Sequence, residues 1–190
     1  FSRNKGAVIG LLFLVALGLL AALAPLLFPF SPWDMQGAPF TPPGEDQFLL
    51  GTDSLGRDVA AGIAYGASVS MLIGVVSTLA AVGIGVLLGA LAGYAGGRVD
   101  DLIMRFTEIF QTVPGFVLAI VVVAILTPSL GSIVVAIAVV SWPPVARVVR
   151  AECLSLRSRE FVQAAEVLGR SHAAIICREI LPNVASSVVV

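Results

Sequence analysis

Charged residues are scarce in this chain of 190 residues: they make up 12% of it, against 58% hydrophobic residues. A soluble globular domain carries roughly 25% charged residues. The mean hydropathy of +1.01 agrees with the low charge content. This composition excludes an ordinary soluble domain and predicts an all-α, polytopic helical membrane protein.

Cysteine and histidine are scarcer still, with two Cys and one His. Cys153 and Cys177 fall on the side that we predict to be cytoplasmic, where thiols stay reduced, so we expect no disulfide. We expect His172 to be a surface residue rather than a ligand or base. There is no Walker A glycine loop, no paired His and Cys for a metal, and no His or Asp inside the spans for an intramembrane protease. We therefore expect no enzyme activity, no metal, no cofactor held by this chain and no nucleic-acid partner.

Lysine and arginine are distributed unevenly. Arg57 alone lies in the loop after the first apolar segment, whereas Arg3 and Lys5 precede that segment and most of the others lie between 147 and 183. Positive residues gather on the cytoplasmic side of membrane proteins. The N-terminus and the 147–183 region are therefore predicted to face the cytoplasm from a plasma (inner) membrane.

Long apolar runs predict about five membrane spans, since one span needs roughly 20 apolar residues. The expected spans are 6–30, about 69–93, about 102–126, 132–149, and one that opens at Val184. The chain starts at Phe1 and stops within an apolar run, so we expect further helices beyond its end. A signal peptide is the competing interpretation of the first run. Pro25, directly after an Ala-Leu-Ala sequence, and the apolar turn through Phe30 favour an anchor.

Small residues recur at every fourth position of the second span. They are Ser77, Ala81, Gly85, Gly89, Gly93 and Gly97. Such a ridge allows another helix to approach closely, and Gly85, Gly89 and Gly93 are our candidates for helix packing. The alternative is that glycine is merely common in membrane helices.

The start of the third span has a polar face. The residues that step along it are Asp101, Arg105, Glu108 and Thr112. Arg105 and Glu108 are spaced to pair with each other. With Gln111 and Thr112 they are candidates for a solute path or for polar contacts within the helix. The alternative is that they lie at the headgroup level and only anchor the helix.

Prolines mark breaks at three places. Pro114 predicts a kink in the third span, and Pro143 with Pro144 predicts that the fourth span bends or unwinds. Residues 31–50 are rich in Pro and Gly and are expected to form a loop without regular structure.

A motif follows that loop, at Gly51-Thr52-Asp53 and Gly56-Arg57-Asp58. Asp53 or Ser54 is predicted to cap a helix that lies at the membrane interface and leads into the second span.

Residues 158–183 form the longest charged stretch away from the termini. Ser158 is predicted to cap a first helix, which Gly169 ends in a left-handed conformation. Ser171 caps a second helix, which Pro182 stops. We call this pair of helices the elbow.

The elbow resembles the cytoplasmic loop of binding-protein-dependent ABC importer permeases. The pattern of that loop is Glu-Ala-Ala, three residues, Gly, nine residues, then Ile-x-Leu-Pro, and Gln163 and Glu179 depart from it. The matching residues are Ala164, Ala165, Gly169, Leu181 and Pro182. The outer pattern Gly-Thr-Asp-x-x-Gly-Arg-Asp resembles the C-type permease of dipeptide, oligopeptide and nickel importers.

The resemblance implies a fold like that of type I ABC importer permeases. Its expected parts are a membrane anchor over 1–30, an external loop over 31–65, and a permease core over 66–190 that contains the elbow. It implies a subunit that moves peptides or a similar small solute into the cell and contacts its ATPase through the elbow. The residues expected to couple the two are Glu160, Ala164, Ala165, Gly169, Leu181 and Pro182.

The implied partners are a homologous B-type permease, two ATPase subunits that carry ATP and Mg, an external solute-binding protein and membrane lipid. Two other classes stay open. An ATP-independent channel or secondary transporter would not need the elbow and would be expected to contain an internal repeat, which we do not find. The other class is a non-transporting membrane scaffold.

Overall fold

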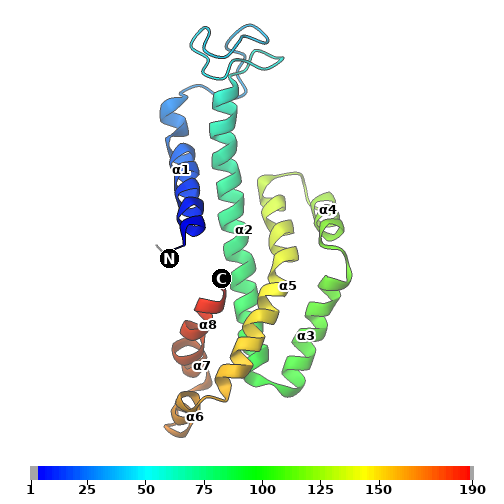
Figure 1. Cartoon of the computed structure of the whole chain (residues 1–190). Helices are drawn as coiled ribbons and strands as arrows, with labels where there is room; N and C mark the ends of the chain where they lie inside the picture. The colour runs from blue at the N-terminus through cyan, green and yellow to red at the C-terminus, as the bar shows by residue number, and fades with distance from the viewer. Residues whose placement is uncertain (1–3, 189–190) are drawn as a thin grey trace. The chain divides into compact units, whose positions relative to one another are not determined.

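The computed structural model describes residues 4–188, and the regular elements in that range are all helices. Figure 1 shows the helices. In chain order they are α1 (Lys5–Leu27), α2 (Val59–Ala95), α3 (Gly97–Thr112), α4 (Gly115–Ile125), α5 (Leu130–Arg157), α6 (Glu160–Val167), α7 (His172–Ile175), the π-helical turn η1 (Ile176–Ile180) and α8 (Leu181–Val188). Arg3 and the last two residues of the expected fifth span lie outside the described residues.

Two compact units divide the chain. The first ends at Gly74 and holds α1, the 28–58 loop and the first part of α2. The second begins at Val75 and holds the rest of α2 and all later elements.

Three helices of the described residues, α1, α2 and α5, are long and apolar enough to cross a membrane. A fourth span results if α3 and α4 count together as one. These helices confirm the predicted class, a polytopic helical membrane protein. The expected fifth span is represented only by the eight residues of α8, which is shorter than a span.

α3 and α4 meet at an angle of 87°. Pro114 disfavours the helical conformation for the residue before it, and Val113 is accordingly extended, with φ −88° and ψ 132°. The kink predicted at Pro114 is confirmed, and it is a full break of the helix.

α5 runs without interruption through Pro143 and Pro144, so the helix does not unwind there, and of the predicted bend or unwinding only a bend is compatible with it. The two prolines lack N–H groups and leave the carbonyls one turn earlier without donors. Packing outweighs this loss: Trp142 and Ala146, on either side of the prolines, form a buried cluster with Ala81 of α2.

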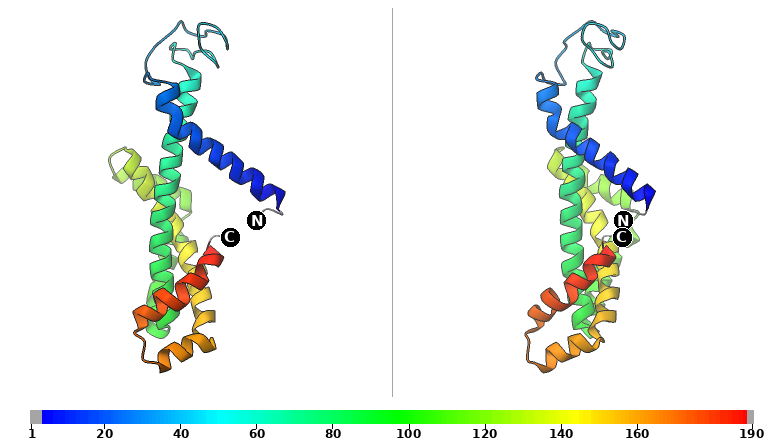
Figure 2. Two further views of the ribbon diagram at one scale, coloured as in Figure 1. Left: turned by 90° about the vertical axis from the view of Figure 1, so that its left-hand side faces the viewer. Right: turned by 60° about the vertical axis from the view of Figure 1, so that its left-hand side comes forward.

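Of the two helix caps predicted in the elbow, one is wrong and one is confirmed. Ser158 does not cap α6, because its hydroxyl donates back to the carbonyl of Ser155 at 2.9 Å, and Arg159 occupies the cap position instead. The Ser171 cap is confirmed by the hydrogen bond from the Ala174 N–H to the Ser171 hydroxyl, at 3.4 Å. Figure 2 shows α6, in orange, turning into the α7–α8 run, in red.

Pro182 does not stop the second arm, which continues as α8. A proline ring inside an α-helix clashes with the carbonyl four residues earlier. The wider π turn just ahead of Pro182, in which the Leu181 N–H bonds to the Ile176 carbonyl, relieves that clash.

Candidate functional site

Gly169 turns the chain between the two arms of the elbow. Its φ is +74°, which confirms the predicted left-handed conformation. The Gly169 N–H donates to the Glu166 carbonyl at 2.9 Å, and the Arg170 N–H donates to the Ala165 carbonyl at 3.1 Å. This pair of bonds is the Schellman motif, which satisfies the last carbonyls of α6. The motif therefore ends α6 just before Gly169.

One face of the elbow is buried in the second unit. Val162, Ile175 and Ile180 are fully buried in a cluster that also contains Val149 and Cys153 of α5. The opposite edge is exposed and apolar, because Val167 is 88% and Leu168 is 79% accessible. The elbow thus has an inner face that holds it to its own chain and an apolar outer edge that nothing in the described chain covers.

The residues that we predict for coupling divide between these two faces. Ala164 and Glu160 are exposed, whereas Ala165 is only 5% accessible and belongs to the buried cluster. Ala165 thus faces inward, and its small side chain lets α6 pack closely on its own unit. Leu181 packs against the same cluster, and Pro182 is exposed.

Tyr94, near the end of α2, joins the elbow to the rest of the unit. It is 8% accessible. Its hydroxyl lies 3.2 Å from the Glu166 carboxylate of α6 and 2.8 Å from Nδ1 of His172 in α7. The Arg157 guanidinium, at the end of α5, lies 6.0 Å from the centre of the Tyr94 ring. His172 is exposed, as we expect. Its hydrogen bond to Tyr94 joins residues 78 positions apart, so the sequence did not predict it.

A partly buried ion pair connects α3 with α5. Arg150 donates through Nε and Nη2 to both carboxylate oxygens of Asp100, and the Asp100 side chain is only 11% accessible. Bidentate, charge-assisted pairs of this kind are stronger than hydrogen bonds between neutral groups. The two residues are 50 positions apart, so sequence spacing did not reveal the pair.

The ion pair predicted between Arg105 and Glu108 is wrong. Both residues are exposed, and the described residues contain no ion pair between them. Gln111 instead accepts a hydrogen bond from Arg147 of α5 at 2.8 Å. Thr112 donates to the Glu108 carbonyl at 2.9 Å, within its own helix.

The glycine ridge of α2 lies against α5. A Cβ at Gly85 would come within 2.6 Å of Val145, and one at Gly93 within 2.6 Å of Cys153. Gly89 likewise faces the backbone of Ala146. The structure thus identifies the partner of the ridge as a helix of the same chain.

In the first unit, the outer motif folds the loop onto the start of α2. Thr52 donates to the Ala38 carbonyl at 2.6 Å. Gly51 and Gly56 have φ of +74° and +73°, and a Cβ at Gly56 would collide with the Gly37 carbonyl. A side chain at residue 56 would therefore meet both an unfavourable backbone conformation and a clash.

The helix cap in this motif is Asp58, so the predicted cap at Asp53 or Ser54 is wrong. Asp58 accepts from the N–H groups of Ala60 and Ala61, and α2 starts at Val59 and continues without a separate short helix. Asp53 pairs with Arg57 at 2.6 Å. The hydrogen bonds from the Arg57 side chain and then from its backbone N–H lower the pKa of Asp53 to about 2.

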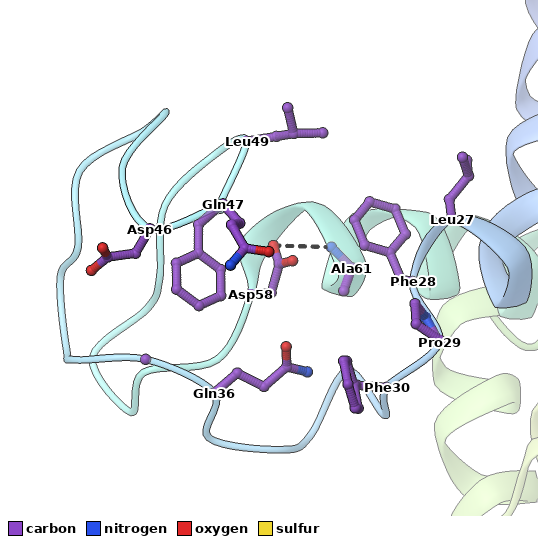
Figure 3. A pocket seen from close by; sticks show the side chains of 12 residues that line it. Leu27, Phe28, Pro29, Phe30, Gln36, Asp46, Gln47, Leu49, Asp58 and Ala61 are labelled. Atoms are coloured by element: carbon purple, nitrogen blue, oxygen red, sulfur yellow. Dashed lines mark hydrogen bonds between the residues drawn. The ribbon is translucent and has the colours of Figure 1, made fainter.

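A cavity of about 610 Å³ lies between the loop and the first turn of α2. Figure 3 shows Gln36, Gln47 and Asp58 around one part of it and Phe28 and Phe30 around another. Among residues 4–188, no three His, Cys, Asp or Glu side chains gather as a metal site would require.

The long apolar helices define a multi-pass membrane protein, and the charged elbow follows the last of them, α5. The chain belongs to the family of binding-protein-dependent transport system inner membrane components, whose model matches residues 85–190. A second model, the N-terminal TM domain of oligopeptide transport permease C, matches residues 1–43.

Named relatives match along the whole chain. It is 38% identical over 196 residues to the dipeptide transport system permease protein DppC of Haemophilus influenzae. It is 41% identical over 194 residues to the oligopeptide transport system permease protein OppC of Escherichia coli K12. All of this chain is covered in both matches, and it spans 66% and 64% of those relatives.

Proposed function

We propose that this chain is the C-type membrane subunit of an ATP-driven ABC importer that carries dipeptides, oligopeptides or a similar small solute into the cell. The relatives named above support a peptide substrate, because both are permeases of peptide transport systems. Membership of the binding-protein-dependent family supports delivery of the solute by an external binding protein.

The observation that carries the proposal is the two-faced elbow. Its inner face is buried against α5, and its outer edge exposes Val167 and Leu168 beside the Gly169 turn. Adjacent exposed apolar side chains on this charged segment support a protein-binding surface there. An ATPase docked on this edge would push against an element that is already packed on two membrane helices.

The proposed assembly contains a homologous B-type permease, two ATPase subunits that bind ATP and Mg, and the external binding protein. This chain contributes half of the solute path and no catalytic site of its own. Its N-terminus faces the cytoplasm, and the 31–65 loop faces outside. The coupling role of Glu160, Ala164, Gly169, Leu181 and Pro182 belongs to this proposal.

Purification of the full-length protein through a tag, from its own host, tests the proposal. We expect ATPase subunits to co-purify, and we expect the reconstituted complex with its binding protein to take up a radiolabelled dipeptide or pentapeptide only when ATP is present. A variant with Asp at both exposed positions 167 and 168 should lose the ATPases while remaining in the membrane. Uptake without ATP, or a solitary homo-oligomer, would favour a channel or secondary transporter and overturn the proposal.

A further inference from the structure

The Tyr94 hydroxyl contacts both arms of the elbow at once. Glu166 lies three residues before Gly169 and His172 three residues after it, and each has a polar atom within hydrogen-bond distance of the same phenol oxygen. Gly169 itself has no heavy atom within 4 Å of a built Cβ, so its turn is open to solvent. The bridge across the turn is therefore made from outside the elbow, by a side chain of α2.

The hydrogen-bonding capacities of the three groups assign the direction of each bond. An ionised carboxylate only accepts, and a phenol has a single hydrogen. Tyr94 must donate that hydrogen to Glu166. Nδ1 of His172 must then carry a hydrogen and donate it to the Tyr94 oxygen. This arrangement forms one chain of bonds, from α7 through α2 to α6.

Other contacts hold Tyr94 in place. Its ring lies in the buried cluster with Val162 and Ile175, one residue from each arm. Arg157 covers the ring and donates to the Ala95 carbonyl at 3.5 Å. The Tyr94 ring is thus held between the end of α2, on which it lies, and Arg157 at the end of α5.

We infer that Tyr94 is a positioning residue that holds the two arms of the elbow at a fixed angle and transmits that angle to α2. Movement of an ATPase against the outer edge then reaches the membrane helices as a displacement of α2, rather than being absorbed by bending at Gly169. The inference rests on the proposed function, and it names the residue through which coupling passes.

The change that tests it is Tyr94→Phe, which removes the hydroxyl and keeps the buried ring. The chain supplies a matched control in its other tyrosine, Tyr65, which also lies on α2 and donates its hydroxyl to a backbone carbonyl, that of Phe28, at 3.0 Å. In reconstituted complexes we expect Tyr94→Phe to keep assembly and basal ATP hydrolysis and to lower uptake per ATP hydrolysed by about tenfold, because it removes the hydrogen bonds to both Glu166 and His172. Tyr65→Phe should keep the wild-type ratio.

A double-mutant cycle shows whether the three groups act as a unit. His172→Phe should lower the ratio as Tyr94→Phe does, and the double variant should lower it no further. Glu166→Gln keeps an acceptor oxygen and should retain coupling. Additive losses from Tyr94 and His172 would overturn the inference.

A measurement without transport completes the test. Spin labels at the exposed native Cys177 and at Val167→Cys, with the buried Cys153 replaced by Ala, report the distance between the arms. We expect the distribution of distances to broaden in Tyr94→Phe and to stay narrow in Tyr65→Phe. If the wild-type complex couples ATP to uptake and Tyr94→Phe changes neither coupling nor distances, the inference fails and the proposed function stands. A wild-type complex that does not couple refutes the proposed function itself.

Discussion

Replacement of Gly89 by alanine tests the close contact between α2 and α5. A Cβ at this position would lie 2.9 Å from the Val149 Cβ and 3.1 Å from the Ala146 Cα, and closer still to the Ala146 carbonyl oxygen. Most of these atoms are backbone, which cannot rotate away. The added methyl therefore forces the two helices apart.

The magnitude follows from two opposing effects. Overpacking of a well-packed site costs about 1–3 kcal/mol. Alanine in place of glycine inside a helix stabilises the folded state by about 0.5–1 kcal/mol. The packing cost is the larger effect, so Gly89→Ala should lower the free energy of unfolding by about 1–2 kcal/mol.

Gly83 provides the control on the same helix. A Cβ there has no heavy atom within 4 Å, so Gly83→Ala gains the helix propensity without a clash and should be stabilised by about 0.5–1 kcal/mol. Unfolding of the full-length protein in detergent by added SDS, followed by far-UV circular dichroism, measures both variants. If Gly89→Ala is as stable as Gly83→Ala, the helices are not in backbone contact and the reasoning is refuted.

Further predictions concern the elbow, the outer loop and the topology. Ala165→Asp should destabilise the purified chain by about 1–3 kcal/mol, because it buries a carboxylate, whereas Ala164→Asp should leave its unfolding unchanged; equal unfolding midpoints would contradict the inward orientation. The Asp53 pKa falls on folding from 3.8 to about 2, so the stability that the Asp53 and Arg57 pair adds is present above pH 3.8 and is lost as the pH drops through 2. Trp33, whose ring lies beside Arg57, should report that loss as a change in fluorescence. Asp53→Asn should abolish this pH-dependent change. Cysteines at 57 and 170, in a background without native cysteines, should react with an impermeant thiol reagent on intact cells at 57 but not at 170; the reverse pattern would overturn the orientation.

Much of the fold follows from local sequence. Scarce charge and long apolar runs predict the membrane class, because a span needs only length and hydrophobicity. Gly169 predicts its own turn, since few other residues adopt a positive φ. Pro114 likewise predicts a break, because it restricts the residue before it.

The sequence did not show which of several suitable residues would cap α2. Asp53, Ser54 and Asp58 are all good cap residues within six positions. Asp53 is drawn to Arg57, which leaves the cap to Asp58. Pro182 would stop an isolated helix, but the π turn before it allows α8 to continue.

The sequence by itself determined the membrane class, the position of the elbow and the presence of a small-residue ridge, because these depend on residues that are near neighbours in the chain. Only the tertiary structure decided which groups meet. It directed Ala165 inward, set the ridge against α5, paired Asp100 with Arg150 and brought His172 to Tyr94. Helix periodicity specifies the faces of one helix, but it holds no information on which distant helix packs against each face. The contacts on which coupling is proposed to depend join helices that are distant in the chain.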